Sequence, residues 1–165
     1  MLRNAIRNKT LRSGKIKGRV VAGWTTKYIF IVYLIILFGS LIEYFILKRE
    51  INIIISISGV LLYAIGIMGR QWAFNSLGKY WSVDIEIREN HEIIRKGPYR
   101  HMRHPNNAFH LLEVIGITLV PNSYYSLLIL LFAYLPIIIL RSIIEEKAMF
   151  IALNENYAKY KQETI

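Results

Sequence analysis

Cysteine is absent from this chain of 165 residues. Its absence excludes disulfide bonds, cysteine-ligated metals and thiol nucleophiles, and it leaves the redox compartment undetermined. The sequence also has no glycine-rich phosphate loop, no Ser-His-Asp arrangement and no Rossmann pattern of the kind found in water-soluble enzymes. Any nucleotide-like cofactor is therefore expected to bind to a loop and to helix ends.

Apolar residues make up 54% of the chain and come in long blocks. A helix that crosses a bilayer needs about 20 such residues, and the blocks 28–47 and 53–74 are long enough. A shorter block, 108–120, and a fourth, 124–140, are predicted to form a tight helical hairpin. The sequence thus predicts an all-α integral membrane protein with about four transmembrane helices.

Acidic residues are few: 11 Asp and Glu stand against 21 Lys and Arg, for a formal net charge of +10. The basic residues crowd three regions, namely residues 1–26, the loop 75–105 and the part after residue 140. By the positive-inside rule these regions and both termini are cytoplasmic. This distribution predicts membrane lipids, not nucleic acid, as the partner of the positive charge.

The chain is predicted to divide into a solvated basic arm, residues 1–26, and a single membrane domain, residues 27–165. Loops as long as 75–105 are uncommon unless they are functional. Within it, the alternation of residues 83–87 predicts either a β-ribbon or an irregular loop.

The C-terminal part is expected to form an amphipathic helix that lies on the loop or on lipid headgroups. This prediction rests on apolar and aromatic residues that recur three and four positions apart: Phe150, Leu153, Tyr157 and Tyr160.

Two charged clusters flank the predicted hairpin. Arg141 and Glu145 are four residues apart on one helical face, so they could form an intrahelical ion pair or contribute to a ligand site. The adjacent Glu146 weakens the ion-pair interpretation, because a simple pair needs one carboxylate. His101 and His104 are three apart, but Pro105 stops a helix there, so no metal site is expected.

Two ionisable residues fall inside the third block, where an unpaired charge is costly. We expect His110 and Glu113 to pair with each other or with Arg103, as a structural device or as the wall of a site.

The polar segments occur in a recognisable order and spacing, and together they resemble the isoprenylcysteine carboxyl methyltransferase family of integral membrane methyltransferases. The resemblance extends over about residues 53 to 162. It is carried by residues 77–82 (LGKYWS), 91–94 (HEII), 97–100 (GPYR) and 103–106 (RHPN), with Arg141 and Glu145-Glu146.

The resemblance implies a helical bundle in which a cytoplasmic loop, within residues 75–107, and the helix end 141–146 enclose S-adenosylmethionine. Glu145 would bind the ammonium group of the cofactor, and Arg141 would orient an acidic substrate. The residues implied in cofactor binding are His91, Glu92, Ile93, Ile94, Tyr99, His104, Pro105, Asn106, Asn107 and Glu145. Asp84 lies where a further polar contact is expected.

One position departs from the family pattern. The family usually has tyrosine two residues after the proline, and this chain has Asn107. The departure concerns the wall beside the lipid substrate more than the cofactor site.

The function implied is a membrane O-methyltransferase that uses S-adenosylmethionine and acts on a lipophilic acid or enol. The acceptor would be an isoprenylcysteine-like carboxylate or a long-chain alkyl-pyrone or phenol, entering from the bilayer. Three alternatives stay open: a phospholipid N-methyltransferase, an NADPH-dependent membrane reductase of the sterol-reductase type, and a non-catalytic membrane binding protein. Arg141 argues against a cationic acceptor.

Overall fold

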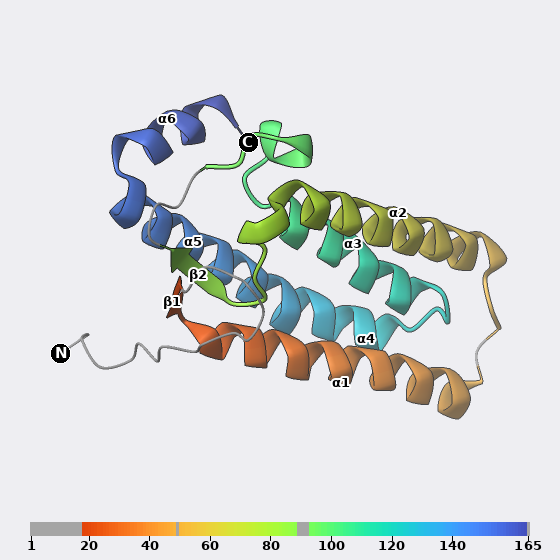
Figure 1. Ribbon diagram of the computed structural model, residues 1–165. Helices are drawn as coiled ribbons and strands as arrows, with labels where there is room; N and C mark the ends of the chain where they lie inside the picture. Colours follow the sequence, from red (N-terminus) through yellow and green to blue (C-terminus); the bar gives the residue numbers. More distant parts are fainter. Residues whose placement is uncertain (1–17, 49, 89–92, 165) are drawn as a thin grey trace.

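The computed structural model describes residues 18–48, 50–88 and 93–164, which form a helical bundle with a small sheet at one end (Figure 1). In chain order the elements are β1 (Gly18–Val21), α1 (Gly23–Leu47), α2 (Ile53–Leu77), η1 (Gly78–Tyr80), β2 (Ile85–Arg88), η2 (Gly97–Arg100), α3 (Pro105–Leu119), α4 (Tyr124–Ile129), η3 (Leu130–Tyr134), α5 (Leu135–Leu153) and α6 (Glu155–Glu163).

Three helical segments are long and apolar enough to cross a membrane: α1, α2 and the continuous run Tyr124–Leu153. The predicted third span is present as α3, but it has only 15 residues. At about 1.5 Å per residue α3 is about 22 Å long, whereas the hydrocarbon core of a bilayer is about 30 Å thick. The described part of the chain therefore has three helices of spanning length, with α3 shorter than a span, where about four spans were expected.

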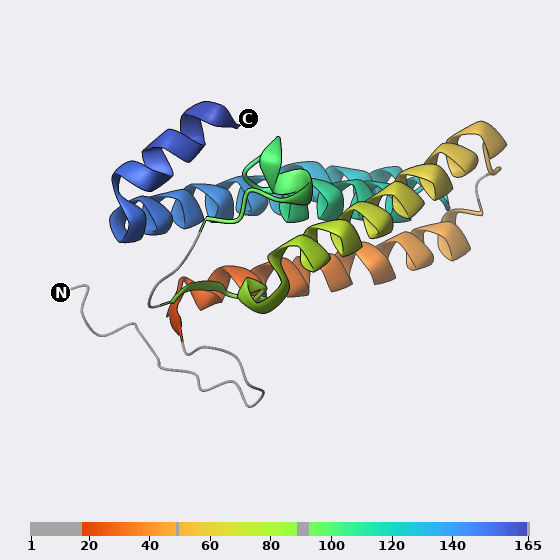
Figure 2. The same cartoon turned by 45° about the horizontal axis from the view of Figure 1, so that its top comes forward.

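The last long helix differs from its predicted range of 124–140. It contains a single π-helical turn, η3, and continues as α5 to Leu153. Pro136 has no N–H to donate to the carbonyl four residues earlier, and a wider turn just before it accommodates the missing bond. Asn154, with φ of 47°, then ends α5. Because of this break α6 turns back beside the loop that carries η2 (Figure 2).

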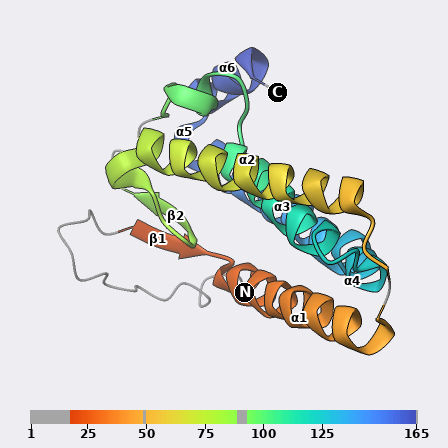
Figure 3. The same cartoon turned by 90° about the vertical axis from the view of Figure 1, so that its right-hand side faces the viewer.

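Helices α2 and α3 lie side by side with their backbones in contact (Figure 3). A Cβ atom built on Gly66 of α2 would lie 2.7 Å from the backbone nitrogen of Glu113. One built on Gly116 of α3 would lie 2.7 Å from the backbone nitrogen of Tyr63. Small residues at such crossings let membrane helices approach closely, and this approach fixes both ends of the loop between α2 and α3.

Replacement of Gly66 by alanine is expected to destabilise the protein. The added methyl group collides with the α3 backbone, and overpacking of this kind costs about 1–3 kcal/mol. Thermal unfolding in detergent should show a lower Tm for Gly66→Ala. The control Ala64→Leu adds volume at an exposed position on the same helix and should leave Tm near that of the wild type. Equal Tm values for Gly66→Ala and wild type would contradict the close contact.

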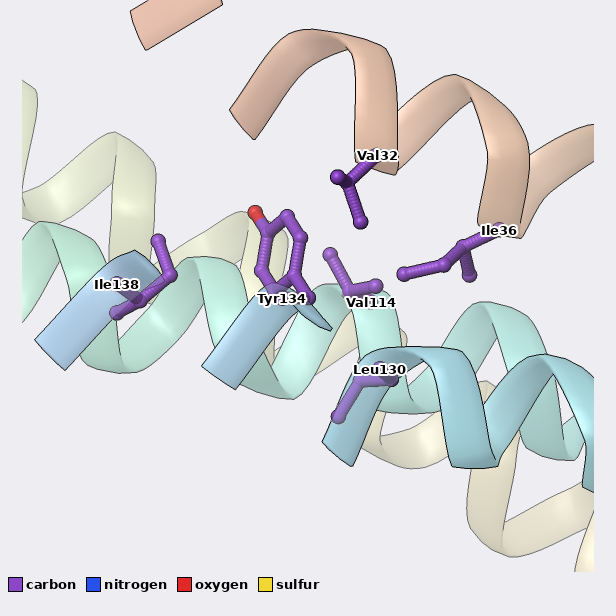
Figure 4. Packing of buried hydrophobic residues seen from close by; sticks show 6 residues of the cluster. All are labelled: Val32, Ile36, Val114, Leu130, Tyr134 and Ile138. Carbon is purple, nitrogen blue, oxygen red and sulfur yellow. The ribbon is translucent and has the colours of Figure 1, made fainter. Parts of the chain in front are cut away.

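The apolar core joins α1, α3 and the last long helix (Figure 4). Its buried members are Val32, Ile36, Val114, Leu130, Tyr134 and Ile138.

Side-chain hydrogen bonds hold the end of the bundle remote from the sheet. The Glu43 carboxylate of α1 accepts hydrogen bonds from the backbone N–H groups of Tyr125 and Ser126, at 3.2 and 3.0 Å. It thereby satisfies donors in the first turn of α4 that helix geometry leaves unpaired. Asn122 accepts a hydrogen bond from the Asn52 N–H at 3.2 Å and donates one to Ser56 Oγ at 2.8 Å. These contacts hold the α3–α4 turn against the start of α2.

The stretch that was expected to be a β-ribbon or an irregular loop forms a ribbon, and its partner is the N-terminal arm. Strands β1 and β2 pair antiparallel, with Val21 opposite Ile85 and Val20 opposite Glu86. The prediction of a solvated arm over 1–26 is therefore wrong for its last part, since residues 18–21 pair in the sheet and 23–26 begin α1. Residues 1–17 lie outside the described part. This small sheet corrects the all-α expectation.

Candidate functional site

The sheet, η2 and α6 gather around α5 at one end of the bundle (Figure 1). Residues of these segments line a cleft there. It encloses about 980 Å³ of free space, counting its opening to solvent. The segments that line it come from α2, the loop that follows, the start of α3, α5 and α6. Residues more than 80 positions apart in the chain thus share one surface, as the prediction from the loop and the helix end required.

Most of the predicted site residues line this cleft. The predicted cofactor residues among them are Ile93, Ile94, Tyr99, His104, Asn106, Asn107 and Glu145. Arg141 and Asp84 line it too. Pro105 is buried in the first turn of α3 and is not part of the lining, whereas His91 and Glu92 lie outside the described residues. Their predicted roles in cofactor binding stay predictions.

The turn formed by Gly97, Pro98 and Tyr99 positions one wall. Gly97 has φ of +56°, and a Cβ there would collide with the side chain of Ser76 at the end of α2. Glycine therefore meets both a conformational and a steric requirement. Tyr99 is buried, and its carbonyl oxygen accepts a 2.7 Å hydrogen bond from the Tyr160 hydroxyl of α6. Burial raises the pKa of Tyr160 to about 12, so this hydroxyl stays a donor at neutral pH.

The two adjacent carboxylates of α5 face different partners. Glu146 pairs with Arg103 at 3.0 Å and with Lys161 of α6 at 2.7 Å, so it holds the loop and α6 against α5. Glu145 lines the cleft, and 38% of its side chain is exposed. Its one ion-pair partner among the described residues is His104, whose Nδ1 lies 3.4 Å away. Glu145 is thus the carboxylate free to meet a cationic ligand.

His104 joins this cluster at the start of α3. Its Nδ1 lies 3.4 Å from Glu145, and its Nε2 lies 3.4 Å from Glu146. Burial alone would lower the pKa of His104, but the hydrogen bond and charge of Glu145, together with Glu146, outweigh burial and raise it. His104 therefore carries its proton to a higher pH than a free histidine.

This raised pKa predicts a pH-dependent stability. A group whose pKa is higher in the folded state stabilises fully below its unfolded pKa, about 6.5 for histidine, and loses this effect as pH rises through the folded pKa. The difference in Tm between wild type and His104→Gln should be largest at about pH 6 and shrink as the pH rises from there. Thermal unfolding in detergent across this range measures it, with the exposed His101→Gln as the control. A difference that does not vary with pH would reject the assignment.

Arg141 does not form the intrahelical ion pair that its spacing allowed. Its Nη1 donates to Thr26 Oγ1 at 2.7 Å and to Thr25 Oγ1 at 3.2 Å, and its Nη2 donates to the Val83 carbonyl oxygen at 2.6 Å. Among the described residues no carboxylate pairs with it. Neutral oxygens therefore hold the guanidinium at the cleft wall, and its positive charge remains available to an anion.

Asn107, the departure from the family pattern, is buried at the cleft wall. Its side-chain amide donates a 3.0 Å hydrogen bond to Ser142 Oγ of α5. The amide thereby joins α3 to α5, and Asn107 and Arg141 line the same cleft.

The pairing predicted for His110 and Glu113 is wrong. Glu113 forms an ion pair with Arg70, a residue inside the second apolar block, and His110 contacts the Tyr134 hydroxyl at 2.8 Å from its Nδ1. Arg103 pairs with Glu146 instead. Arg70 is the one charged residue of that block, near its C-terminal end, and the cost of an unpaired charge in a membrane was the signal that could have identified it as the partner.

Further cleft residues were not predicted as site residues. Met149 lies one turn beyond Glu145 on α5, so helical spacing could have identified it. Tyr157 and Tyr160 were predicted to belong to a helix that lies on the loop or on lipid headgroups, and the structure brings both into the cleft lining. Tyr80 and Trp81, which follow α2, complete one side.

Comparisons with known proteins match parts of this chain to a family and to two relatives. The sequence model of the isoprenylcysteine carboxyl methyltransferase (ICMT) family matches residues 57–151. The uncharacterized protein YpbQ of Bacillus subtilis is 41% identical over 58 residues, which cover 35% of this chain and 34% of that protein. An uncharacterized protein of Haemophilus influenzae is 33% identical over 91 residues, which cover 54% of this chain and 52% of the relative. The matches thus span about half or less of these relatives.

Proposed function

Because the chain belongs to the isoprenylcysteine carboxyl methyltransferase family, a family of membrane methyltransferases, we propose that it transfers a methyl group from S-adenosylmethionine to an oxygen of a lipophilic acid or enol. One observation carries the proposal: a half-exposed carboxylate, Glu145, and a guanidinium without a carboxylate partner among the described residues, Arg141, line the same cleft. Glu145 can bind the cationic end of a cofactor, and Arg141 can bind an anionic acceptor.

The residues present suit S-adenosylmethionine. The buried Asn106 Oδ1 finds no hydrogen-bond partner among the described residues, so it can accept from an amino or hydroxyl group of the cofactor. Ile93 and Ile94 offer an apolar surface for the adenine ring. Glu145 would supply the charge for the ammonium group, and the Tyr99 ring would offer a sulfonium a cation–π interaction of about 1 kcal/mol.

The bound cofactor would supply an electrophilic methyl group on a positively charged sulfur. The protein's tasks are then to hold the acceptor oxygen in line with it and to keep water out. Arg141 orients the anionic oxygen, since a guanidinium presents several N–H donors in a planar fork. Helix α6 covers the cleft through Tyr157 and Tyr160 and is fastened by the Lys161–Glu146 and Tyr160–Tyr99 contacts.

We place the cleft on the cytoplasmic side because Lys and Arg gather at this end of the chain's membrane helices. An acceptor with an apolar tail would reach the cleft from the bilayer, where such a tail is most soluble. A cationic acceptor, as in phospholipid N-methylation, would meet Arg141 as a like charge, which disfavours that alternative.

Calorimetry separates the proposed chemistry from the reductase alternative. The detergent-solubilised full chain should bind S-adenosylhomocysteine, the product of methyl donation, and should not bind NADPH. Binding of NADPH alone would favour a reductase. Binding of neither would favour a non-catalytic membrane protein and would overturn the proposal.

Glu145→Gln should weaken binding of S-adenosylhomocysteine by tenfold or more. The ammonium group loses its charged partner in a partly desolvated cleft, and a tenfold loss corresponds to about 1.4 kcal/mol. Glu155→Gln, at an exposed position on α6, is the matched control and should bind as the wild type does. Equal affinities of the two variants in calorimetry would remove Glu145 from the cofactor site.

Arg141→Ala should leave the affinity for S-adenosylhomocysteine within a few-fold of wild type and should reduce kcat/KM strongly with a lipophilic acid, since the anion loses its orienting partner. Thr26→Val is the control, because it removes a hydrogen bond that holds Arg141 and keeps the cation. If Arg141 only ties α5 to α1, Thr26→Val should reproduce part of the loss. A parallel loss of cofactor affinity and turnover in Arg141→Ala would reject its role at the acceptor.

A further inference from the structure

A groove separate from the cleft lies between the loop that carries η2 and the C-terminal end of α6. Its lining consists of Arg95 and Arg100 from the loop, and of Tyr160, Glu163 and Thr164 from the last part of the chain. It encloses about 600 Å³ of free space, counting its opening to solvent. Of these residues Tyr160 alone also lines the cleft, so the groove is a distinct surface.

The groove carries an excess of positive charge. Arg95 forms an ion pair with Glu163, and its guanidinium carbon lies 5.6 Å from the centre of the Tyr160 ring. These two contacts hold the Arg95 guanidinium in place, and it keeps N–H donors for a further anion because it has five of them. Arg100 is exposed, and no carboxylate among the described residues pairs with it.

Two guanidiniums beside one carboxylate suit a phosphate group. A guanidinium presents its N–H donors in a planar fork that matches two phosphate oxygens, and such charge-assisted hydrogen bonds are among the stronger ones in proteins. The exposed Lys96 precedes η2 and adds to the positive charge of the loop. The groove is therefore chemically suited to an anion of the phosphate type.

The packing of η2 places the groove at the depth where hydrocarbon gives way to headgroups. A Cβ atom built on Gly97, the first residue of η2, would lie 3.0 Å from Trp72 Nε1 of α2. Trp72 is half exposed on a helix long enough to cross a membrane. From Ile53 to Trp72 this helix rises about 28 Å, close to the thickness of about 30 Å of the hydrocarbon core. Tryptophan is enriched at this boundary, and the phosphates of phospholipids lie just outside it.

We propose that the groove binds the phosphate of an anionic phospholipid. Arg95 and Arg100 donate to the phosphate oxygens, and the exposed face of Trp72 lies beside the apolar part of the lipid. A zwitterionic lipid also brings a cation, which the two guanidiniums repel, so an anionic headgroup is preferred. The inference goes beyond the proposed function and stands whether or not the cleft binds a cofactor.

Native mass spectrometry of the detergent-solubilised full chain measures the affinity for phosphatidylglycerol and for phosphatidylcholine with the same acyl chains. Wild type should bind phosphatidylglycerol more tightly. Arg100→Gln should weaken binding of phosphatidylglycerol about fivefold, as expected when one basic residue is lost from an anionic membrane surface. Lys159→Gln removes the same charge from an exposed position of α6 outside the groove, and it should bind as wild type does.

Glu163→Gln separates lipid binding from a structural role of the ion pair. If the groove binds phosphate, loss of its carboxylate should keep or raise the affinity for phosphatidylglycerol, whereas Arg95→Gln should lower it. If Arg95 and Glu163 only fasten α6 to the loop, both variants should lower the affinity, and this result would overturn the inference.

Two further results would overturn the inference: equal affinities of wild type for the two lipids, and equal affinities of Arg100→Gln and Lys159→Gln for phosphatidylglycerol. Inorganic phosphate at the concentration of the lipid should not displace phosphatidylglycerol. Displacement would assign the groove to free phosphate and reject the lipid. Since Arg100 has no carboxylate partner among the described residues, Arg100→Gln should keep the Tm of wild type without added lipid. Should it fail to fold, Arg95→Gln replaces it in the comparison with Lys159→Gln.

Discussion

The close contact between α2 and α3 is the constraint on which the site depends. Gly66 and Gly116 let the two backbones touch, and the loop that carries η2 begins where α2 ends and finishes where α3 begins. Both ends of this loop are therefore fixed by one helix pair. The α5 carboxylates therefore contact a loop whose position is fixed, and the cleft lies between α5 and this loop.

Polar contacts at the cleft serve structure and chemistry together. Arg141 connects α5 to α1 and to the segment before β2, so the proposed acceptor ligand also holds the sheet against the bundle. Glu146 fastens α6, whereas its neighbour Glu145 faces the cleft. Adjacent residues on a helix point about 100° apart, and this rotation lets one carboxylate close the cleft while the other remains open to a ligand.

Particular residues show which features of the structure could be predicted from the sequence. Apolar blocks located the long helices. The order of the motifs identified the family, and most of the site residues predicted from it, from Ile93 to Glu145, line the cleft. The hydrogen-bond and ion-pair partners of individual side chains were harder to predict. Arg141 was four residues from Glu145 and yet bonds to Thr25, Thr26 and Val83, and Glu113 pairs with Arg70 in place of His110. In each case the partner lies on another helix or segment, at a distance in sequence that no periodicity encodes.

The sequence by itself determined the membrane class, the helix-forming blocks and the residues available for chemistry, because hydrophobicity, helix periodicity and residue type are local properties. Only the tertiary structure decided that the arm pairs with β2, that α3 is too short to span a bilayer alone and that α6 turns back at Asn154. It also decided that Arg141 donates its hydrogen bonds to Thr25, Thr26 and Val83. These outcomes depend on how closely helices approach one another. That approach is set by side-chain volume and by the cost of unpaired polar groups in the assembled bundle.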